Sequence, residues 1–466
     1  MSVNGSSFYA GALWALTLGI LGSSCLPMPF ALSNLGVFYG TLATFTVALA
    51  NSYTGTIVLV ASYALNTHTY EDLCFMVSGK KRIVKLISQV TMFMLLFGTQ
   101  CASAALLGDC GSLFIKGVLQ DRVSLPSDTV VNWLGLILLT GAVVLPLSLK
   151  KQIRSLEHAA AAGTALVVIL LLIIASTCIL DGFPALRSGD FPVFTIPKEF
   201  RRDIPESISI LSFAFYLQPL LLPLLSEMPP GEDGLKLTCR ALRHVTLGIA
   251  FLVYMALGLF AGMRYGHDTK GDILLNKWLP DEYEPILEIL IAMYIAVSVC
   301  PIVIAMRYLV MDFPLVPSRM SNAAITSACV FSPALVVGFF PQESQLFFSI
   351  SGATAVCLIA YVFPVLIHLS LYFSKEDRLG YLSEESIQEI MGNEYESTDE
   401  DHVMDDGHQY TSLLIPPILK YPNIQNIRHA TTWGKISETF SYIFVPIGIL
   451  LLGLCSSIIA MRLALS

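Results

Sequence analysis

Thr17–Pro29, TLGILGSSCLPMP, is the stretch of this chain that decides its fold. It lies inside an apolar block, but it combines small residues with prolines: Gly19, Gly22, Ser23, Ser24, Pro27 and Pro29. Such residues interrupt the hydrogen-bond ladder of a helix. Within the hydrocarbon of a membrane, a broken helix is tolerated only where it lines a cavity or binds something, because unpaired backbone groups are costly there. The stretch therefore predicts a broken helix with a site at the break.

The composition indicates that this block does lie in a membrane. The 466 residues have a mean hydropathy of +0.68, and only 13% of them are charged. A soluble chain would carry about twice that charged fraction. The apolar blocks lack the period of two that a barrel requires, so we predict an all-α integral membrane protein. Its eleven expected spans lie near 9–32, 37–63, 84–109, 131–149, 159–180, 206–228, 241–263, 286–309, 320–340, 345–373 and 439–463.

A second span shows the same kind of interruption. Phe213–Glu227, FAFYLQPLLLPLLSE, contains Pro219 and Pro223. The two interrupted spans are the first and the sixth, which correspond if the chain consists of two inverted five-helix repeats, about 9–180 and 206–373, followed by one extra helix. Paired interruptions of this kind point to a transporter binding site near the bilayer midplane. The alternative explanation is that these prolines kink packed helices without forming a binding site.

The geometry of a broken helix suggests what the site would bind. Amide groups at the start of a half-helix attract a carboxylate, and carbonyls at the end of a half-helix attract an ammonium group. A zwitterion such as an amino acid fits both, with its carboxylate near Gly22–Cys25 and its amine near Phe213–Phe215. No mid-span carboxylate is evident to select a cationic side chain, which favours a neutral substrate. The predicted substrate-binding residues are Thr17, Gly19, Gly22, Ser23, Ser24, Cys25, Phe213, Ala214, Phe215, Gln218 and Ser298.

Charge patterns predict the orientation and the domains. Lysine and arginine gather in the loops after the second, fourth and sixth spans, so we expect a cytoplasmic N-terminus. We expect a transporter core over 1–373, an acidic cytoplasmic loop without fixed structure over 374–435, and the eleventh helix in 436–466. The loop could be a solvated linker or a regulatory segment. Tyr410–Leu413 resembles a tyrosine-based sorting signal, which would allow the plasma membrane or a vacuolar or lysosomal membrane.

Five stretches together resemble one known family, the amino acid/auxin permeases. Gly22–Gly36 is similar to that family's helix-1 signature, G-x-G-x-L-x-x-P-x-A, and Thr69–Leu73 is similar to its loop after helix 2. Leu145–Leu149, Phe213–Glu227 and Ser351–Thr354 resemble its helices 4, 6 and 10. The matches follow in order along nearly the whole chain. The resemblance implies a LeuT-type fold with eleven helices and coupled transport of amino acids.

Departures from the family pattern affect the coupling ion. Leu18 stands where the sodium-coupled neutral branch has an asparagine of its ion site, and Ser298 is an approximate counterpart of its helix-8 threonine. Leucine offers no oxygen to a hard cation, so we expect proton coupling or exchange rather than sodium coupling. Glu288, Glu227 and His368 are ionisable groups near the ends of spans, and an ionisable group within a span is functional by default. Of the three, Glu288 is the proton-coupling candidate. Snorkelling of its carboxylate to the interface is the competing explanation.

Other classes of function fit less well. We find no phosphate loop, no His/Cys metal spacing and no nucleophile motif, so we expect no enzyme activity, no metal, no cofactor and no nucleic-acid partner. No filter-like element suggests a channel. The main alternative to a transporter is a permease-like sensor that binds an amino acid and signals with little or no flux.

Overall fold

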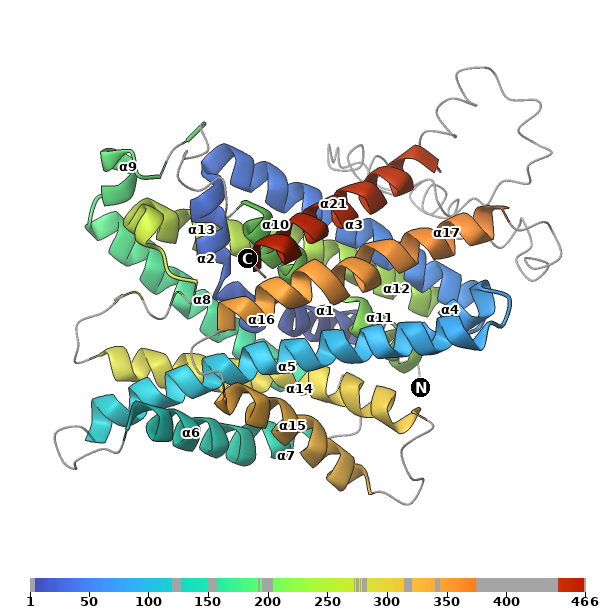
Figure 1. Ribbon diagram of the computed structural model, residues 1–466, viewed down its shortest axis with the longest axis horizontal. Coiled ribbons are helices and arrows are strands. Elements are labelled where there is room, and N and C mark those ends of the chain that lie inside the picture. Colours follow the sequence, from blue (N-terminus) through green and yellow to red (C-terminus); the bar gives the residue numbers. More distant parts are fainter. Residues whose placement is uncertain are drawn as a thin grey trace.

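The fold is a bundle of long helices with irregular connections (Figure 1). The computed structural model describes residues 5–119, 127–149, 157–191, 193–194, 204–271, 273, 276, 278, 283–313, 321–339, 344–373 and 443–464. Every regular element in these ranges is helical. The first part of the chain forms α1 (Gly5–Leu21), η1 (Ser23–Cys25), α2 (Met28–Leu35), α3 (Val37–Ala64), α4 (Tyr70–Val77), α5 (Arg82–Leu119), α6 (Asp128–Leu139), η2 (Thr140–Val144), α7 (Leu145–Ser148), α8 (Glu157–Leu180) and α9 (Pro184–Ser188).

The second part begins with another interrupted helix. Its elements are α10 (Ile204–Ala214), α11 (Gln218–Glu227), α12 (Glu232–Arg243), η5 (His244–Ala250), α13 (Phe251–Tyr265), η6 (Gly266–Asp268), α14 (Glu284–Met311), α15 (Asn322–Gly338), α16 (Ser344–Ser351), η8 (Gly352–Val362), α17 (Phe363–Phe373) and α21 (Val445–Ala464). The η1 and η6 turns are 3₁₀-helical, whereas η2, η5 and η8 are π-helical insertions within longer helices.

The described helices confirm a multi-pass membrane protein. Eight of them are long and apolar enough to cross a bilayer, and the bent pair α1–α2 would make a ninth. α15 and α21 are apolar but contribute shorter apolar stretches. The count of eleven spans and the two inverted repeats stay predictions. The acidic stretch of 374–435 and Tyr410–Leu413 lie outside the described residues, so their expected roles are not tested.

Both predicted breaks are present. α1 and α2 are separated by η1, and the two halves of this span meet at an angle of 48°. α10 and α11 are separated by the non-helical residues 215–217. Gly36, with φ of 75°, then turns the chain sharply from α2 into α3, a conformation in which only glycine is unstrained. Both breaks lie within the packed interior, because all residues from Gly22 to Pro29 and from Phe213 to Leu222 are buried.

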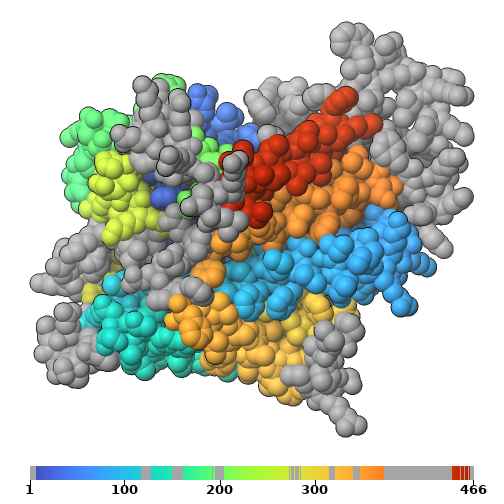
Figure 2. All heavy atoms as spheres, viewed as in Figure 1, coloured from blue at the N-terminus to red at the C-terminus, as the bar shows by residue number. Residues whose placement is uncertain are grey.

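The helices α5 and α14 pack together next to the breaks. α5 lies alongside α14 over much of its length, and it also contacts α6, α15 and α16 (Figure 1). α5 and α6 approach at Gly111 and Gly135, where a Cβ added to Gly111 would lie 2.8 Å from the Cα of Gly135. On one face of the molecule, α21 lies beside the helix formed by α16, η8 and α17 (Figure 2).

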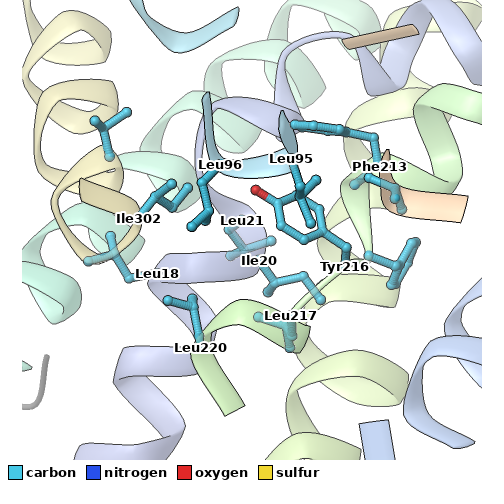
Figure 3. Close-up of a cluster of buried hydrophobic side chains, with 14 of the residues drawn as sticks. Leu18, Ile20, Leu21, Leu95, Leu96, Phe213, Tyr216, Leu217, Leu220 and Ile302 are labelled. Atoms are coloured by element: carbon cyan, nitrogen blue, oxygen red, sulfur yellow. The ribbon is translucent and has the colours of Figure 1, made fainter. Parts of the chain in front are cut away.

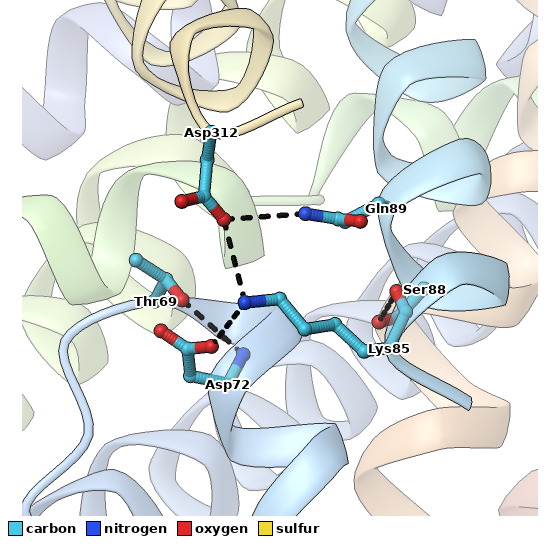
Figure 4. A network of polar contacts seen from close by, with 6 residues as sticks. All are labelled: Thr69, Asp72, Lys85, Ser88, Gln89 and Asp312. Atoms are coloured by element: carbon cyan, nitrogen blue, oxygen red, sulfur yellow. Dashed lines mark hydrogen bonds and ion pairs between the residues drawn. The ribbon is translucent and has the colours of Figure 1, made fainter. Parts of the chain in front are cut away.

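One end of the bundle is joined by a polar network (Figure 4). Lys85, near the start of α5, lies 2.6 Å from the carboxylate of Asp72 in α4 and 3.5 Å from that of Asp312, the residue that follows α14. Gln89 donates to the same Asp312 carboxylate at 3.2 Å, and the Thr69 hydroxyl caps α4 by accepting from the Asp72 amide. The network therefore links the loop after α3 to the two central helices.

The contact between Gly111 and Gly135 generates a stability prediction. Gly111→Ala places a methyl group against backbone that cannot move aside, so we expect it to lower the free energy of unfolding by about 1–3 kcal/mol. The control is Gly248→Ala, where no heavy atom lies within 4 Å of the added carbon. Thermal unfolding of the purified protein in detergent measures both. Equal melting temperatures for the two variants would contradict the prediction.

Candidate functional site

The break in the first span is built on one glycine. Gly22 has φ of −17° and ψ of −145°, which takes the chain out of the helix. Its amide still donates to the Leu18 carbonyl at 3.2 Å, and the Cys25 amide donates to the Gly22 carbonyl at a long 3.4 Å. Ser23, Ser24 and Cys25 are all buried in the single 3₁₀ turn that follows. The break thus concentrates weakly paired backbone in the interior.

The break in the sixth span ends at a glutamine. The Tyr216 amide donates to the Phe213 carbonyl at 3.4 Å, and the next amide, that of Leu217, donates to the side-chain oxygen of Gln218 at 3.0 Å. Proline follows immediately at Pro219, in the first turn of α11, where a missing amide costs nothing. Gln218 therefore satisfies, with its own side chain, the amide of the residue that precedes α11.

A single hydroxyl group joins the two breaks. Tyr254 in α13 is fully buried, and its phenol group contacts the carbonyl of Ile20 near the end of α1 and the carbonyl of Ala214 at the end of α10, the latter at 3.0 Å. Ser24 donates to the same Ile20 carbonyl at 2.8 Å and lies 2.9 Å from the phenol oxygen. Carbonyls at a helix C-terminus carry partial negative charge. Two such ends therefore converge at one point, which suits a cationic group.

α5 supplies hydroxyl groups to both breaks. The Ser103 hydroxyl lies 2.7 Å from that of Ser23, and the Thr99 hydroxyl lies 2.8 Å from that of Tyr216. Thr99 and Ser103 are four residues apart, so they share a face of the helix. This face of α5 spans the distance between the two interruptions.

α14 contacts the break in the first span from another direction. The Tyr294 hydroxyl donates to the Gly22 carbonyl at 3.4 Å. The Ser298 hydroxyl donates to the Ile295 carbonyl of its own helix, and it would lie 3.5 Å from a Cβ on Gly22. The structure thus places Ser298 beside Gly22, as expected for residues of one site.

Apolar side chains pack between the breaks (Figure 3). None of the labelled side chains is charged, and the single oxygen among them is the Tyr216 hydroxyl. They come from α1, α5, α10, α11, α14 and the break after α10: Leu18, Ile20, Leu21, Leu95, Leu96, Phe213, Tyr216, Leu217, Leu220 and Ile302. Helix-end carbonyls beside an apolar cluster suit a molecule with a polar head and an uncharged side chain.

The predicted residues fall into two groups. Gly22, Ser23, Ser24, Cys25, Ala214, Phe215, Gln218 and Ser298 lie at or against the breaks. The ring of Phe215 packs on Tyr254. The remaining predicted residues lie further into the helices, and of these Phe213 packs on Tyr216 and Phe348.

Gly19 lies so close to Leu220 that an added Cβ would fall 2.3 Å from its side chain. Thr17 is fully buried, and its hydroxyl has no hydrogen-bond partner among the described residues. Glu288 is 8% exposed on α14, about two turns before Tyr294. Binding by any of these residues stays a prediction.

The sequence-based prediction missed the residues that join the elements. Tyr254, Tyr216, Thr99 and Ser103 were not among the predicted site residues, although each contacts a break. A weak signal existed for two of them, because Thr99 and Ser103 place two hydroxyl groups on one face of an apolar helix. Tyr254 is one aromatic residue within a span, which no local pattern distinguishes from a packing residue.

The chain is similar to known amino acid transporters. Residues 6–390 match the family described as "Transmembrane amino acid transporter protein". The chain is similar to amino acid transporter AVT6E of Arabidopsis thaliana, with 25% identity over 59% of this chain and 55% of that protein. It is also similar to human solute carrier family 38 member 10, with 22% identity over 78% of this chain and 32% of that protein. The matched part thus spans about half and one third of these two relatives.

Two further similarities cover more of the related protein. Amino acid transporter AVT6D of Arabidopsis thaliana is 22% identical over 79% of this chain and 86% of its own length. The crystal structure of MhsT in complex with L-phenylalanine, a LeuT-type structure, aligns with a TM-score of 0.56 at 11% identity. That alignment covers 97% of this chain and 98% of MhsT. At this identity the likeness supports the fold alone.

The position of Tyr254 generates a prediction about stability. Tyr254→Phe removes the hydroxyl that the Ile20 and Ala214 carbonyls share, so buried acceptors lose a donor. We expect the free energy of unfolding to fall by about 1–3 kcal/mol. The matched control is Tyr39→Phe, because Tyr39 is 41% exposed, and it should change stability by less than about 0.5 kcal/mol. Equal melting temperatures for the two variants in detergent would show that the shared hydroxyl contributes nothing.

Proposed function

Because this chain belongs to the transmembrane amino acid transporter family, we propose that it carries amino acids across a membrane by alternating access. The observation that carries the proposal is the convergence of the Ile20 and Ala214 carbonyls on Tyr254. The ammonium group of an amino acid can replace or share the phenol donor at these carbonyls. Its carboxylate then lies toward the amides of Ser23–Cys25, at the other side of the break in the first span.

We propose that the substrate is a neutral amino acid. The side chains that pack between the breaks are aliphatic or aromatic, so an uncharged substrate side chain would replace apolar contacts with apolar contacts (Figure 3). A charged side chain would lose its hydration without gaining a partner there, which costs several kcal/mol. Thr17, Gly19, Cys25, Phe213 and Phe215 complete the proposed pocket.

We propose that protons rather than sodium ions drive transport. The Leu18 side chain packs on Gly163, where an added Cβ would lie 3.1 Å from it. Leu18 also belongs to the apolar cluster that contains Ile302 (Figure 3). These aliphatic groups offer no oxygen at the position where sodium-coupled relatives have an amide. Glu288 is the buried carboxyl group closest along α14 to Tyr294 and Ser298, and it is our candidate for the coupling proton.

Proteoliposomes provide the test of this proposal. Labelled neutral amino acids should accumulate when an inward proton gradient is imposed, and replacing sodium with choline should leave uptake unchanged. A protonophore should abolish the accumulation, and protein-free vesicles control for leakage. Specific binding without flux would instead identify a sensor. A requirement for sodium would overturn the assignment of the coupling ion.

Glu288→Gln tests the proton site separately. Because glutamine cannot release a proton, we expect the variant to lose accumulation driven by the gradient while it keeps exchange of labelled for unlabelled amino acid at equal pH. The matched control is Glu227→Gln at the end of α11, which should keep the gradient response. If Glu288→Gln accumulates substrate like the natural protein, the proton is carried by another group.

A further inference from the structure

A chain of four polar side chains surrounds the break between α10 and α11. Its members are Ser212 in α10, Tyr361 in η8, Asn51 in α3 and Gln218 in α11. All are buried, with exposed fractions of 6%, 5%, 2% and 1% respectively. Buried polar groups in a membrane protein are costly unless they form hydrogen bonds, so these four side chains must find their partners within the protein.

The network begins at the break itself. The side-chain oxygen of Gln218 accepts from the Leu217 amide at 3.0 Å, which directs its NH₂ group toward α3. That group donates to the Asn51 side-chain oxygen and lies equally close to the Thr54 hydroxyl, both at 3.4 Å. Gln218 thus uses both ends of its side chain within the protein, and it holds the start of α11 to α3.

The orientation of Asn51 is fixed from the other side. Its NH₂ group donates to the Val47 carbonyl of its own helix at 3.0 Å and to the Tyr361 hydroxyl at 2.9 Å. Turning the amide over would place its oxygen against the Val47 carbonyl. The Tyr361 hydroxyl also interacts with the Ser212 side chain. The network therefore connects α11 to α10, the two halves of the broken helix, through side chains of α3 and η8.

Two more contacts hold Tyr361 in place. The Tyr70 hydroxyl of α4 donates to the Ile359 carbonyl at 2.8 Å, within the π-helical turns that carry Tyr361. Gly453 of α21 packs against the ring, so that an added Cβ would lie 3.1 Å from a Tyr361 ring carbon. The last helix of the chain therefore supports the network from outside (Figure 2).

We propose that Gln218 and Tyr361 are positioning residues, which set the distance and angle between α10 and α11 without contacting the solute. This refines the predicted role of Gln218 as a substrate ligand, and for its effect on transport it rests on the proposed function. The carbonyl of Ala214, which Tyr254 contacts, is at the end of α10, so any change in the break moves an acceptor of the site. The hydrogen-bond partners of Gln218 are the Leu217 amide and the side chains of Asn51 and Thr54, all of them uncharged. The network therefore keeps its geometry at any ordinary pH.

Gln218→Glu tests the proposal, because it makes the network depend on pH. A carboxylate still accepts from Leu217, but only a protonated carboxyl group can donate to Asn51. With equal pH on both sides of the vesicle, we expect exchange by the variant, relative to the natural protein, to be about tenfold lower near pH 7.5. It should recover near about pH 5, where the buried carboxyl is protonated. Most of the loss near pH 7.5 should appear as a higher apparent KM rather than as a lower maximal rate.

Two controls separate positioning from packing. Gln218→Leu, with no donor, should be impaired at both pH values without recovery. Thr44→Val removes a buried hydroxyl of α3 whose one hydrogen bond within the described part of the chain is to the Gly40 carbonyl of the same helix. This variant should behave like the natural protein at both pH values. If Gln218→Leu does not fold, Tyr361→Phe removes one hydroxyl of the network and should shift the KM in the same direction.

Hydrogen–deuterium exchange of the segment 213–221 provides a readout that needs no transport. The Leu217 segment of Gln218→Glu should exchange faster than that of the natural protein near pH 7.5 and at the same rate near about pH 5. The positioning role would be overturned if Gln218→Glu and the natural protein exchanged deuterium at the same rate at both pH values, and if Gln218→Leu transported amino acid as fast as the natural protein. Failure of the natural protein to move any amino acid would overturn the proposed function alone, because the exchange measurement would still decide the inference.

Discussion

A helix that is broken inside a membrane must satisfy its free backbone groups within the protein, because lipid offers no hydrogen bonds. The rest of this structure depends on that constraint. At the first break the Ile20 carbonyl is satisfied by Ser24 and Tyr254, and at the sixth span the Leu217 amide is satisfied by Gln218. The helices that supply these partners must therefore surround the breaks.

The same constraint explains how much of the fold the sequence could predict. Interruptions such as Gly22 and Pro219 are local, and the apolar blocks around them are long. The sequence therefore predicts both breaks, and the apolar helices that the structure describes as long enough to span a membrane, at nearly their observed positions. The family resemblance rested on the same stretches, and the match over residues 6–390 confirms it. The π-helical turns of η2, η5 and η8 were not predicted, since they arise from packing between helices rather than from a residue pattern.

The candidate site was only partly predictable, and the reason is physical. Backbone groups at a break belong to known positions, so Ser23, Ser24 and Ala214 could be named from the sequence. Their partners come from distant helices, as in the contact between Tyr254 and Ala214 or between Ser103 and Ser23. For Gln218, the sequence indicated a polar residue at the break but not the direction of its amide, which the structure turns toward α3.

The contact between Gly111 and Gly135 has a consequence for movement. Where two helix backbones touch with no side chain between them, the helices pack as closely as two backbones allow. We therefore expect α5 and α6 to move together as one body. Since α5 also carries Thr99 and Ser103, the hydroxyl face shared by the two breaks belongs to this body. The alternating access proposed above would then move the broken helices against this body.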